Sequence, residues 1–231
     1  NILNCLPKYN YMFSNRVLQY YHQLSRPANL PSHVEVLHPY ENKYALSLCQ
    51  QFYEKYYSDD QPRKILFGIN PGRLGAGLTG IPFTDPIVLS DRCGIPNTLN
   101  QRAELSSSFI YDMITSYGGP AAFYARYYIS ALSPLGYVSK GVNLNYYDLP
   151  NYKALFESYI VTQIKAQLNF NIDRSVAFSV GKGKNFDFLS YLNKKHHFFD
   201  AVVALPHPRW VMQYKLKQKD DFIADYLAQL K

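Results

Sequence analysis

Four short apolar runs constrain the fold of this chain more than any other feature, because each stops abruptly at glycine, proline or small polar residues. The runs cover residues 64–69, 127–132, 175–180 and 198–205. Segments with helical periodicity lie between them. Apolar strands that alternate with helices indicate a parallel sheet covered on both faces. The sequence therefore predicts an α/β fold, a three-layer α/β/α sandwich with a central four-stranded parallel sheet.

The segments between these runs predict the remaining elements. Helices are expected at residues 11–24, 41–57, 105–117, 120–126 and 152–168. Two more are expected, one directly after the third strand and one at the Lys-rich C-terminus. Proline makes the stretch 27–39 extended, and a loop rich in glycine and proline is expected up to about residue 100. No repeat or long linker interrupts the sequence. We therefore expect residues 1–231 to form a single domain, with the helices of residues 1–60 packing on the sheet.

Composition excludes several classes of protein. No apolar run approaches the roughly 18 residues of a membrane span, so no membrane association is expected. The three cysteines, at positions 5, 49 and 93, fit neither a disulfide framework nor a CxxC zinc motif. No HxxxH pair is present either. We expect free thiols in the cytoplasm, near the nucleoid, and no metal or cofactor.

The charge of the chain favours a polyanionic partner. Lys and Arg number 24 against 17 Asp and Glu, which gives a net charge of +7. From Arg174 onward ten Lys and Arg face five Asp and Glu, so most of the excess lies in the last quarter of the chain. Such an excess suits nucleic acid. We expect DNA as the partner, bound by a monomer.

Polar and glycine-rich residues follow all four predicted strands. These segments are 70–73, 130–135, 181–184 and 207–209. Ligands of parallel sheets bind in the crevice at the carboxyl ends of the strands. The sequence therefore predicts one site at that edge of the sheet.

One glycine motif at this edge suggests a nucleotide cofactor but fits it poorly. Gly75-Ala-Gly77-Leu-Thr-Gly80 matches GxGxxG. The dinucleotide fingerprint places its glycines at a tight turn between a strand and a helix. Here a gap separates the first glycine from the strand, and Pro82 and Pro86 disfavour a long helix. A nucleotide-cofactor oxidoreductase is thus the weakest of the alternatives.

A longer string around these glycines is much more specific. Gly68-Ile-Asn70-Pro71-Gly72-Arg-Leu-Gly75-Ala-Gly-Leu-Thr79-Gly80-Ile-Pro82-Phe83 resembles the first catalytic motif of the uracil-DNA glycosylase superfamily. It is most similar to the single-strand-selective monofunctional family, whose pattern is G-M-N-P-G-x-x-G-x-x-x-T-G-x-P-F. His207-Pro208-Arg209 resembles a shortened form of the second motif, H-P-S-P-R. The resemblance implies an enzyme that flips uracil out of DNA and hydrolyses its glycosidic bond, leaving an abasic site.

The resemblance also implies a role for individual residues. Asn70 would position the attacking water, and His207 would donate a hydrogen bond to uracil O2. The bland alternatives are an Asx turn for Asn70 and a surface imidazole for His207. The expected base-binding residues are Ile69, Gly72, Phe83 and Ser130. The expected DNA-binding residues are Pro71, Ser106, Lys182, Lys184, Arg209 and Trp210. For Ser106 a simple helix N-cap is equally consistent.

One position departs from the family pattern. The family reads the Watson–Crick edge of uracil with the Asn of its H-N-L-C-P-L string, and Ala131 aligns there. Either Ser130, Asn143 or Asn145 replaces that Asn, or the choice of base is altered, for example toward xanthine or hypoxanthine. This departure and the short second motif leave a different class open, a catalytically inactive member that only binds nucleic acid.

Overall fold

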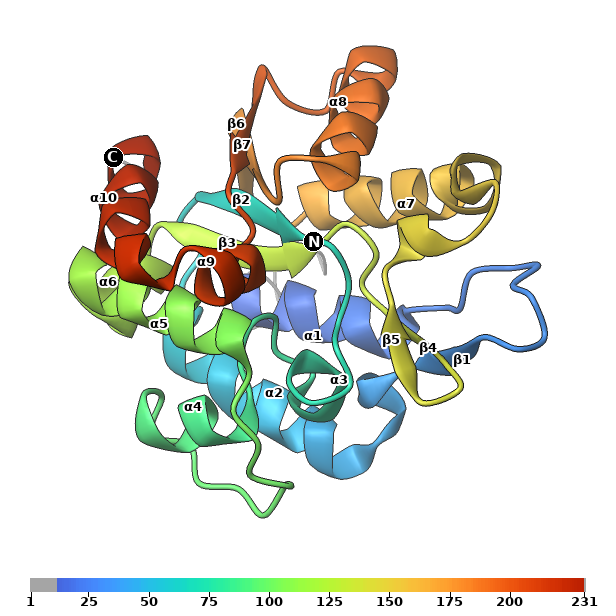
Figure 1. The fold of residues 1–231 in the computed structure, drawn as a ribbon. Helices are drawn as coiled ribbons and strands as arrows, with labels where there is room; N and C mark the ends of the chain where they lie inside the picture. The colour runs from blue at the N-terminus through green and yellow to red at the C-terminus, as the bar shows by residue number, and fades with distance from the viewer. Residues whose placement is uncertain (1–11, 231) are drawn as a thin grey trace, which may run out of the picture.

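The computed structural model describes residues 12–230 and contains the predicted four-stranded parallel sheet (Figure 1). Its strand order is β3-β2-β6-β7, and every neighbouring pair is parallel. The strands are β2 (Arg63–Gly68), β3 (Tyr127–Ala131), β6 (Ile172–Val180) and β7 (Ala201–Leu205). Each overlaps a predicted apolar run. The α/β fold with a central parallel sheet is confirmed.

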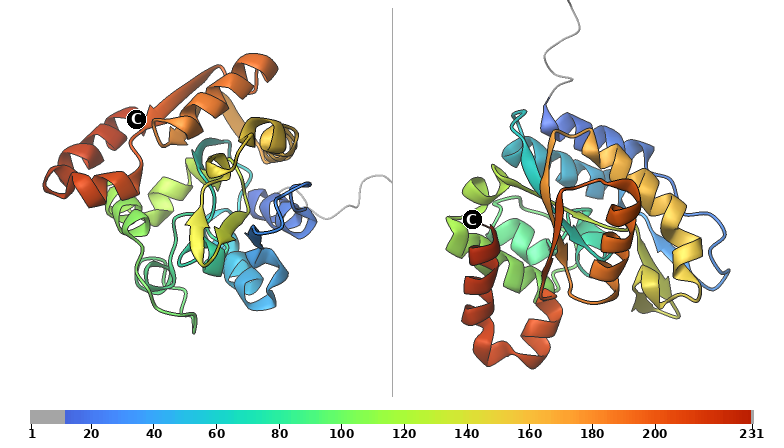
Figure 2. Two further views of the ribbon diagram at one scale, coloured as in Figure 1. Left: turned by 45° about the vertical axis from the view of Figure 1, so that its right-hand side comes forward. Right: turned by 90° about the horizontal axis from the view of Figure 1, so that it is seen from above.

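Helices cover both faces of this sheet, as the alternation along β3 shows. Tyr128 packs against Phe13 and Phe170 on one face. The neighbouring Tyr127 points to the other face and contacts Phe123, because successive side chains of a strand alternate. One face carries α1 (Phe13–Gln23), α2 (Lys43–Tyr56), α7 (Tyr152–Leu168) and α8 (Lys184–His196); the other carries α5 (Leu105–Tyr117), α6 (Pro120–Tyr124), α9 (Pro208–Tyr214) and α10 (Lys219–Leu230) (Figure 2).

The predicted helices match these elements, with small shifts at their ends. The expected helix 11–24 begins one residue outside the described range, so the start at Tyr11 is not described. The expected single C-terminal helix is instead a pair, α9 and α10, joined by the 3-10 turn η4 (Leu216–Gln218). The loop expected up to residue 100 also contains two short helices, α3 (Ala76–Thr79) and α4 (Pro86–Asp91). Proline at the first turn of α4 and the Asp85 side chain, which accepts a hydrogen bond from Val88 N at 2.9 Å, explain α4.

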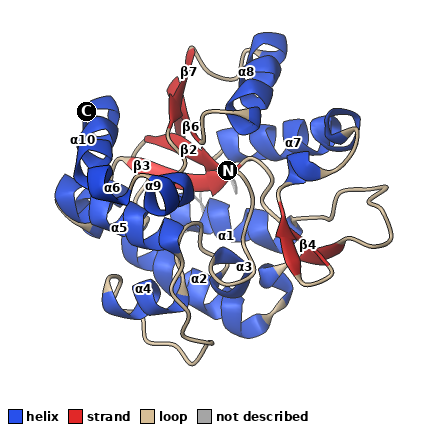
Figure 3. Cartoon of the chain, in the orientation of Figure 1, coloured by secondary structure: helices blue, strands red, loops and turns tan. Residues whose placement is uncertain are grey.

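A second, smaller sheet was not predicted from the sequence. Its strand order is β1-β4-β5, antiparallel throughout, formed by β1 (Glu35–Leu37), β4 (Gly136–Ser139) and β5 (Val142–Leu144) (Figure 3). Strands of three or four residues are too short to show a period of two in the sequence. Gly136 lets β4 pass the loop after β2, since a Cβ there would lie 2.4 Å from Pro71 O. The hairpin β4–β5 is thereby held beside Asn70.

The first residue of β2 is a buried arginine, Arg63. Arg63 is 0% exposed. Its Nη1 donates to Asp59 Oδ1 at 2.8 Å and to Gln61 O at 3.0 Å, and its Nε donates to Tyr124 O at 2.7 Å. The rings of Phe13 and Tyr57 lie within 5 Å of the guanidinium carbon. Every nitrogen of this buried cation is therefore engaged, as Nη2 also reaches Asp59.

The described cysteines are buried thiols, and Cys5 lies outside the described residues. Cys49 Sγ donates to Thr79 O at 3.2 Å, and Cys93 Sγ lies 3.1 Å from Tyr111 Oη. Burial raises the pKa of the Cys93 thiol to about 11, so it stays protonated near neutral pH. Within residues 12–230, no helix combines the length and the apolar character that a membrane crossing requires.

Candidate active site

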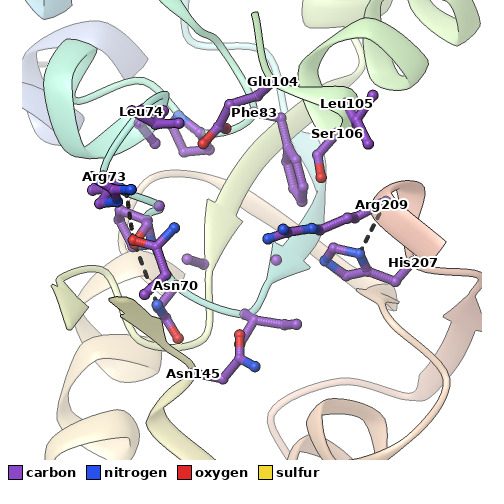
Figure 4. A pocket seen from close by; sticks show the side chains of 18 of the residues that line it. Asn70, Arg73, Leu74, Phe83, Glu104, Leu105, Ser106, Asn145, His207 and Arg209 are labelled. Carbon is purple, nitrogen blue, oxygen red and sulfur yellow. Dashed lines mark hydrogen bonds between the residues drawn. The ribbon is translucent and has the colours of Figure 1, made fainter. Parts of the chain in front are cut away.

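A cavity of about 710 Å³ opens at the carboxyl edge of the parallel sheet (Figure 4). Its walls are the residues after β2 and β3, the first turn of α5, the hairpin β4–β5 and the start of α9. The cavity brings together ten of the twelve predicted site residues: Ile69, Asn70, Pro71, Gly72, Phe83, Ser106, Ser130, His207, Arg209 and Trp210. Segments far apart in the sequence thus meet at the edge where the sequence predicted a site.

Asn70 is fixed in the cavity wall by the main chain that follows β5. Its Nδ2 donates to Leu144 O at 3.1 Å, and its Oδ1 accepts from Tyr146 N at 3.0 Å. A side-chain amide oxygen has two lone pairs. One remains for a water molecule in the cavity, and the orientation of the amide is set before any ligand binds. Nδ2 also reaches Pro71 O at 3.3 Å, but Oδ1 accepts from Tyr146 N and not from the N–H two residues on, as the Asx-turn alternative requires.

His207 forms the N-cap of α9 and is held as one tautomer. Its Nδ1 accepts from Arg209 N at 3.2 Å. An acceptor nitrogen carries no proton, so the proton of the neutral ring is on Nε2. Burial, with a contribution from the charge of Arg209, lowers the pKa of His207 to about 4. Tyr226 Oη also donates to Pro206 O and fixes the turn that presents the ring. His207 is therefore a neutral hydrogen-bond donor at neutral pH.

Phe83 and His207 are neighbours in the cavity wall, with their ring planes tilted by 56° to each other. The ring centroids are 6.4 Å apart. Phe83 has a φ of +51°, a backbone conformation that costs energy in a bulky residue and is concentrated at functional sites. Its ring lies directly on Gly68, where a Cβ would approach Phe83 Cε2 to 2.9 Å. Phe83 is half-buried: it packs against the hydrophobic core and also lines the cavity.

Glu104 also lines the cavity, although it is not among the residues for which the sequence predicts a role. It is the N-cap residue of α5, and its backbone N donates to Asp85 Oδ2 at 2.8 Å. Burial and the neighbouring Asp85 raise the pKa of its carboxyl group. The signal available in the sequence was a single acidic residue before a helix, which is common at helix starts.

The residue that stands where the family reads the base offers no polar group. Ala131 lines the cavity, and Ser130 beside it is 2% exposed. Asn145 is engaged in a capping box with Asp148. Asn143 uses its Oδ1 to accept from Arg73 N at 3.1 Å, and no acceptor within residues 12–230 contacts its Nδ2. Asn143 is therefore the better placed of the two asparagines to donate to a ligand.

The predicted DNA-binding residues divide into two groups. Arg209, Trp210, Pro71 and Ser106 lie at the cavity. Ser106 is on the first turn of α5 and is not its N-cap, which is Glu104. Lys182 and Lys184 do not line the cavity. Lys184 Nζ lies 5.6 Å above the ring of Tyr147, a residue of the cavity rim, so the turn after β6 flanks the site from outside.

Comparison with known proteins identifies the family. The model of the Uracil DNA glycosylase superfamily matches residues 54–231. The crystal structure of wild-type SMUG2 from Pedobacter heparinus is similar to this chain with a TM-score of 0.92 and 40% sequence identity, over 94% of this chain and 96% of that one. No curated protein matches the chain. From the family match and this likeness we conclude that the chain belongs to the uracil DNA glycosylase superfamily.

Proposed function

We propose that this protein is a monofunctional DNA glycosylase that hydrolyses the glycosidic bond of uracil in DNA. The observation that carries the proposal is the convergence of Asn70, Phe83 and His207 on one cavity, each held in place by contacts of its own. A flipped base is bound by stacking on an aromatic ring and by hydrogen bonds to its edge, which Phe83 and His207 can supply. Membership of the superfamily supports the same chemistry.

The geometry suggests how the reaction proceeds. The base stacks on Phe83, and His207 Nε2–H donates to a base carbonyl. As the bond from C1′ to the base nitrogen breaks, its electron pair moves onto the base, and the donor stabilises the developing negative charge. Asn70 Oδ1 holds a water molecule, whose oxygen bonds to C1′ and whose proton is released. The products are an abasic site and the free base.

The cavity wall around Phe83 and His207 supplies the remaining contacts in this proposal. Gly72 and the Ile69 backbone line the edge of the base, and Asn143 Nδ2 takes over part of the reading that Ala131 cannot do. Ser130 lies deeper in the wall. Arg209 and Trp210 contact DNA at the mouth, with Pro71 and Ser106 beside them. Lys182 and Lys184 bind phosphates further out. The chain acts as a monomer in this account.

Ala131 also favours a second candidate, an inactive member that binds DNA without cutting the glycosidic bond. Alanine cannot hydrogen-bond the Watson–Crick edge. The two candidates differ in whether a base is released, because both predict binding to DNA that weakens with salt.

The test is an excision assay with end-labelled oligonucleotides, single- and double-stranded, that carry one uracil. Alkali then cleaves the strand wherever a base has been removed. Strand cleavage at uracil is the result that the proposal expects. If uracil is untouched, the same oligonucleotides with xanthine, hypoxanthine or 5-hydroxymethyluracil decide whether the base choice has changed. Binding without release of any of these bases contradicts the enzyme and supports the inactive member.

A further inference from the structure

The carboxyl group of Glu104 is a buried acidic group at the cavity that the proposed chemistry does not use. It packs against two glycines of the turn that follows β2. A Cβ on Gly72 would lie 3.0 Å from Glu104 Oε1, and one on Gly75 would lie 2.2 Å from Oε2. Only glycine leaves room for the carboxylate at Gly75. The side chain thus fits into the inner surface of the turn that carries Gly72.

The backbone of this turn also acts on the charge of the same carboxylate. The backbone N–H groups of Gly75 and Leu74 favour its charged form, against the burial that disfavours it. Asp85, its acidic neighbour, already accepts from Val88 N at 2.9 Å and from Glu104 N at 2.8 Å. Asp85 therefore accepts hydrogen bonds from the starts of α4 and α5, while the Glu104 side chain packs against the turn after β2.

Arg209 is the cation that faces Glu104 across the cavity. Its charge favours the ionised form of Glu104 and disfavours the protonated form of His207. Figure 4 shows the guanidinium directed over the cavity, beside the His207 ring, with Glu104 on the opposite wall. No acceptor for the guanidinium is found within the part of the chain that the structure describes. Glu104 forms no ion pair with Arg209, so its charge acts on the guanidinium from across the cavity and not through a direct contact.

We propose that Glu104 is a positioning residue that supports the Gly72–Gly75 turn in the cavity wall and attracts the Arg209 guanidinium from across the cavity. The proposal rests on the proposed glycosylase function for its effect on rate. Its effect on the free protein does not depend on that function.

The first test is a double-mutant cycle measured as single-turnover rates of uracil release. Glu104→Gln keeps the shape and removes the charge, and we expect a fall of about tenfold, in the range found for coupled neighbours. The double variant Glu104→Gln/Arg209→Gln should be slower than Arg209→Gln by a smaller factor than Glu104→Gln costs the wild type, and Glu104→Asp should recover part of the rate. Independent, multiplying effects would overturn the coupling, and so would a wild-type rate for Glu104→Gln.

The second test uses the free protein and no DNA. Trp210, the only tryptophan in the chain, is next to Arg209 and 43% exposed. Loss of this attraction in Glu104→Gln should change the quenching of Trp210 fluorescence by acrylamide, whereas the control Glu35→Gln, at the exposed first residue of β1, should not. Thermal melting checks that each variant is folded. Unchanged quenching in Glu104→Gln contradicts the proposal. Changed quenching in a protein that releases no base supports it and contradicts only the proposed function.

Discussion

The two ends of β2 both hold polar side chains, but they hold them in opposite ways. At the amino end Arg63 is fully buried, and every nitrogen of its guanidinium has an acceptor. At the carboxyl end Asn70 keeps one lone pair free, and His207 Nε2 points its proton at a cavity. A satisfied buried group stabilises the fold, whereas groups that are held but left open can bind something else. The polar group at the amino end of β2 thus stabilises the fold, while those at its carboxyl end are available to bind a ligand.

The largest effect is expected at the open end, from His207→Ala. Removing one donor to a developing negative charge typically lowers the rate roughly 10² to 10³-fold. Single-turnover excision of uracil measures this effect. His33→Ala, an exposed histidine away from the cavity, is the matched control and should keep the wild-type rate. Equal rates for the two variants would remove His207 from the proposed mechanism.

At the closed end, Arg63→Leu should reduce the free energy of unfolding by about 3 kcal/mol, because loss of one member of a buried, hydrogen-bonded set leaves its partners unsatisfied. Urea unfolding measures it. Arg92→Leu removes a more exposed arginine whose pair with Asp112 spans 3.4 Å, and should cost under about 0.5 kcal/mol. The folded fraction of Arg63→Leu should excise uracil at the wild-type rate. A large loss of excision rate in folded Arg63→Leu would mean that the amino end of β2 affects the chemistry at its carboxyl end.

Gly68→Ala sharpens the comparison because it lies between the two ends. The new methyl group would lie 2.9 Å from the Phe83 ring and push the ring toward the cavity. We expect a clear loss of excision rate together with a destabilisation of about 1–3 kcal/mol, as in other overpacked sites. Gly183→Ala after β6, where a Cβ meets nothing within 4 Å, is the control. An unchanged rate in Gly68→Ala would show that Phe83 does not stack on the base.

The open end should also make stability depend on pH. The pKa of His207 is lowered to about 4 in the folded protein, against about 6.5 in an unfolded chain. Its contribution is therefore fully present above pH 6.5 and is lost as the pH falls toward 4. His207→Asn keeps a capping side chain without this titration. The urea midpoint of unfolding should fall more between pH 7 and pH 4.5 in wild type than in His207→Asn. Equal falls would contradict the assignment of this pH dependence to His207.

The smallest effects are expected at the lysines after β6. Lys182→Ala and Lys184→Ala should each weaken DNA binding and reduce the slope of log affinity against log salt by about one. Fluorescence anisotropy over a series of salt concentrations measures this slope. Excision at saturating protein should not change, since neither lysine lines the cavity. A loss of rate at saturation would place the turn after β6 in the active site.

The sequence predicted what depends on local pattern. The four strands are continuous apolar runs with hard stops, so their number, their parallel direction and the edge that carries the site could be inferred before the structure, but their order in the sheet could not. Asn70 and His207 follow such stops directly. Their positions at the cavity agree with that inference, and their chemical roles remain predictions.

What the sequence could not predict depends on contacts between distant segments. The hairpin β4–β5 is made of strands too short for a pattern, yet it supplies Leu144 O, and the turn after it supplies Tyr146 N, to the two ends of the Asn70 amide. Glu104 gains its place only because Gly72 and Gly75 leave room for it. The lysines after β6 were grouped with the site because they follow a strand end, but the cavity is built by the other three ends.

The most direct test of this account compares Asn70→Ala with wild type in two measurements on the same samples, single-turnover excision of uracil and urea unfolding. Asn100→Ala, an exposed asparagine outside the cavity, is the control for both. The account predicts that Asn70→Ala excises uracil at least about 100-fold more slowly, in the range of other lost transition-state contacts. Its unfolding midpoint should stay far closer to wild type than that of Arg63→Leu. An Asn70→Ala protein that excises uracil at the wild-type rate would contradict the account.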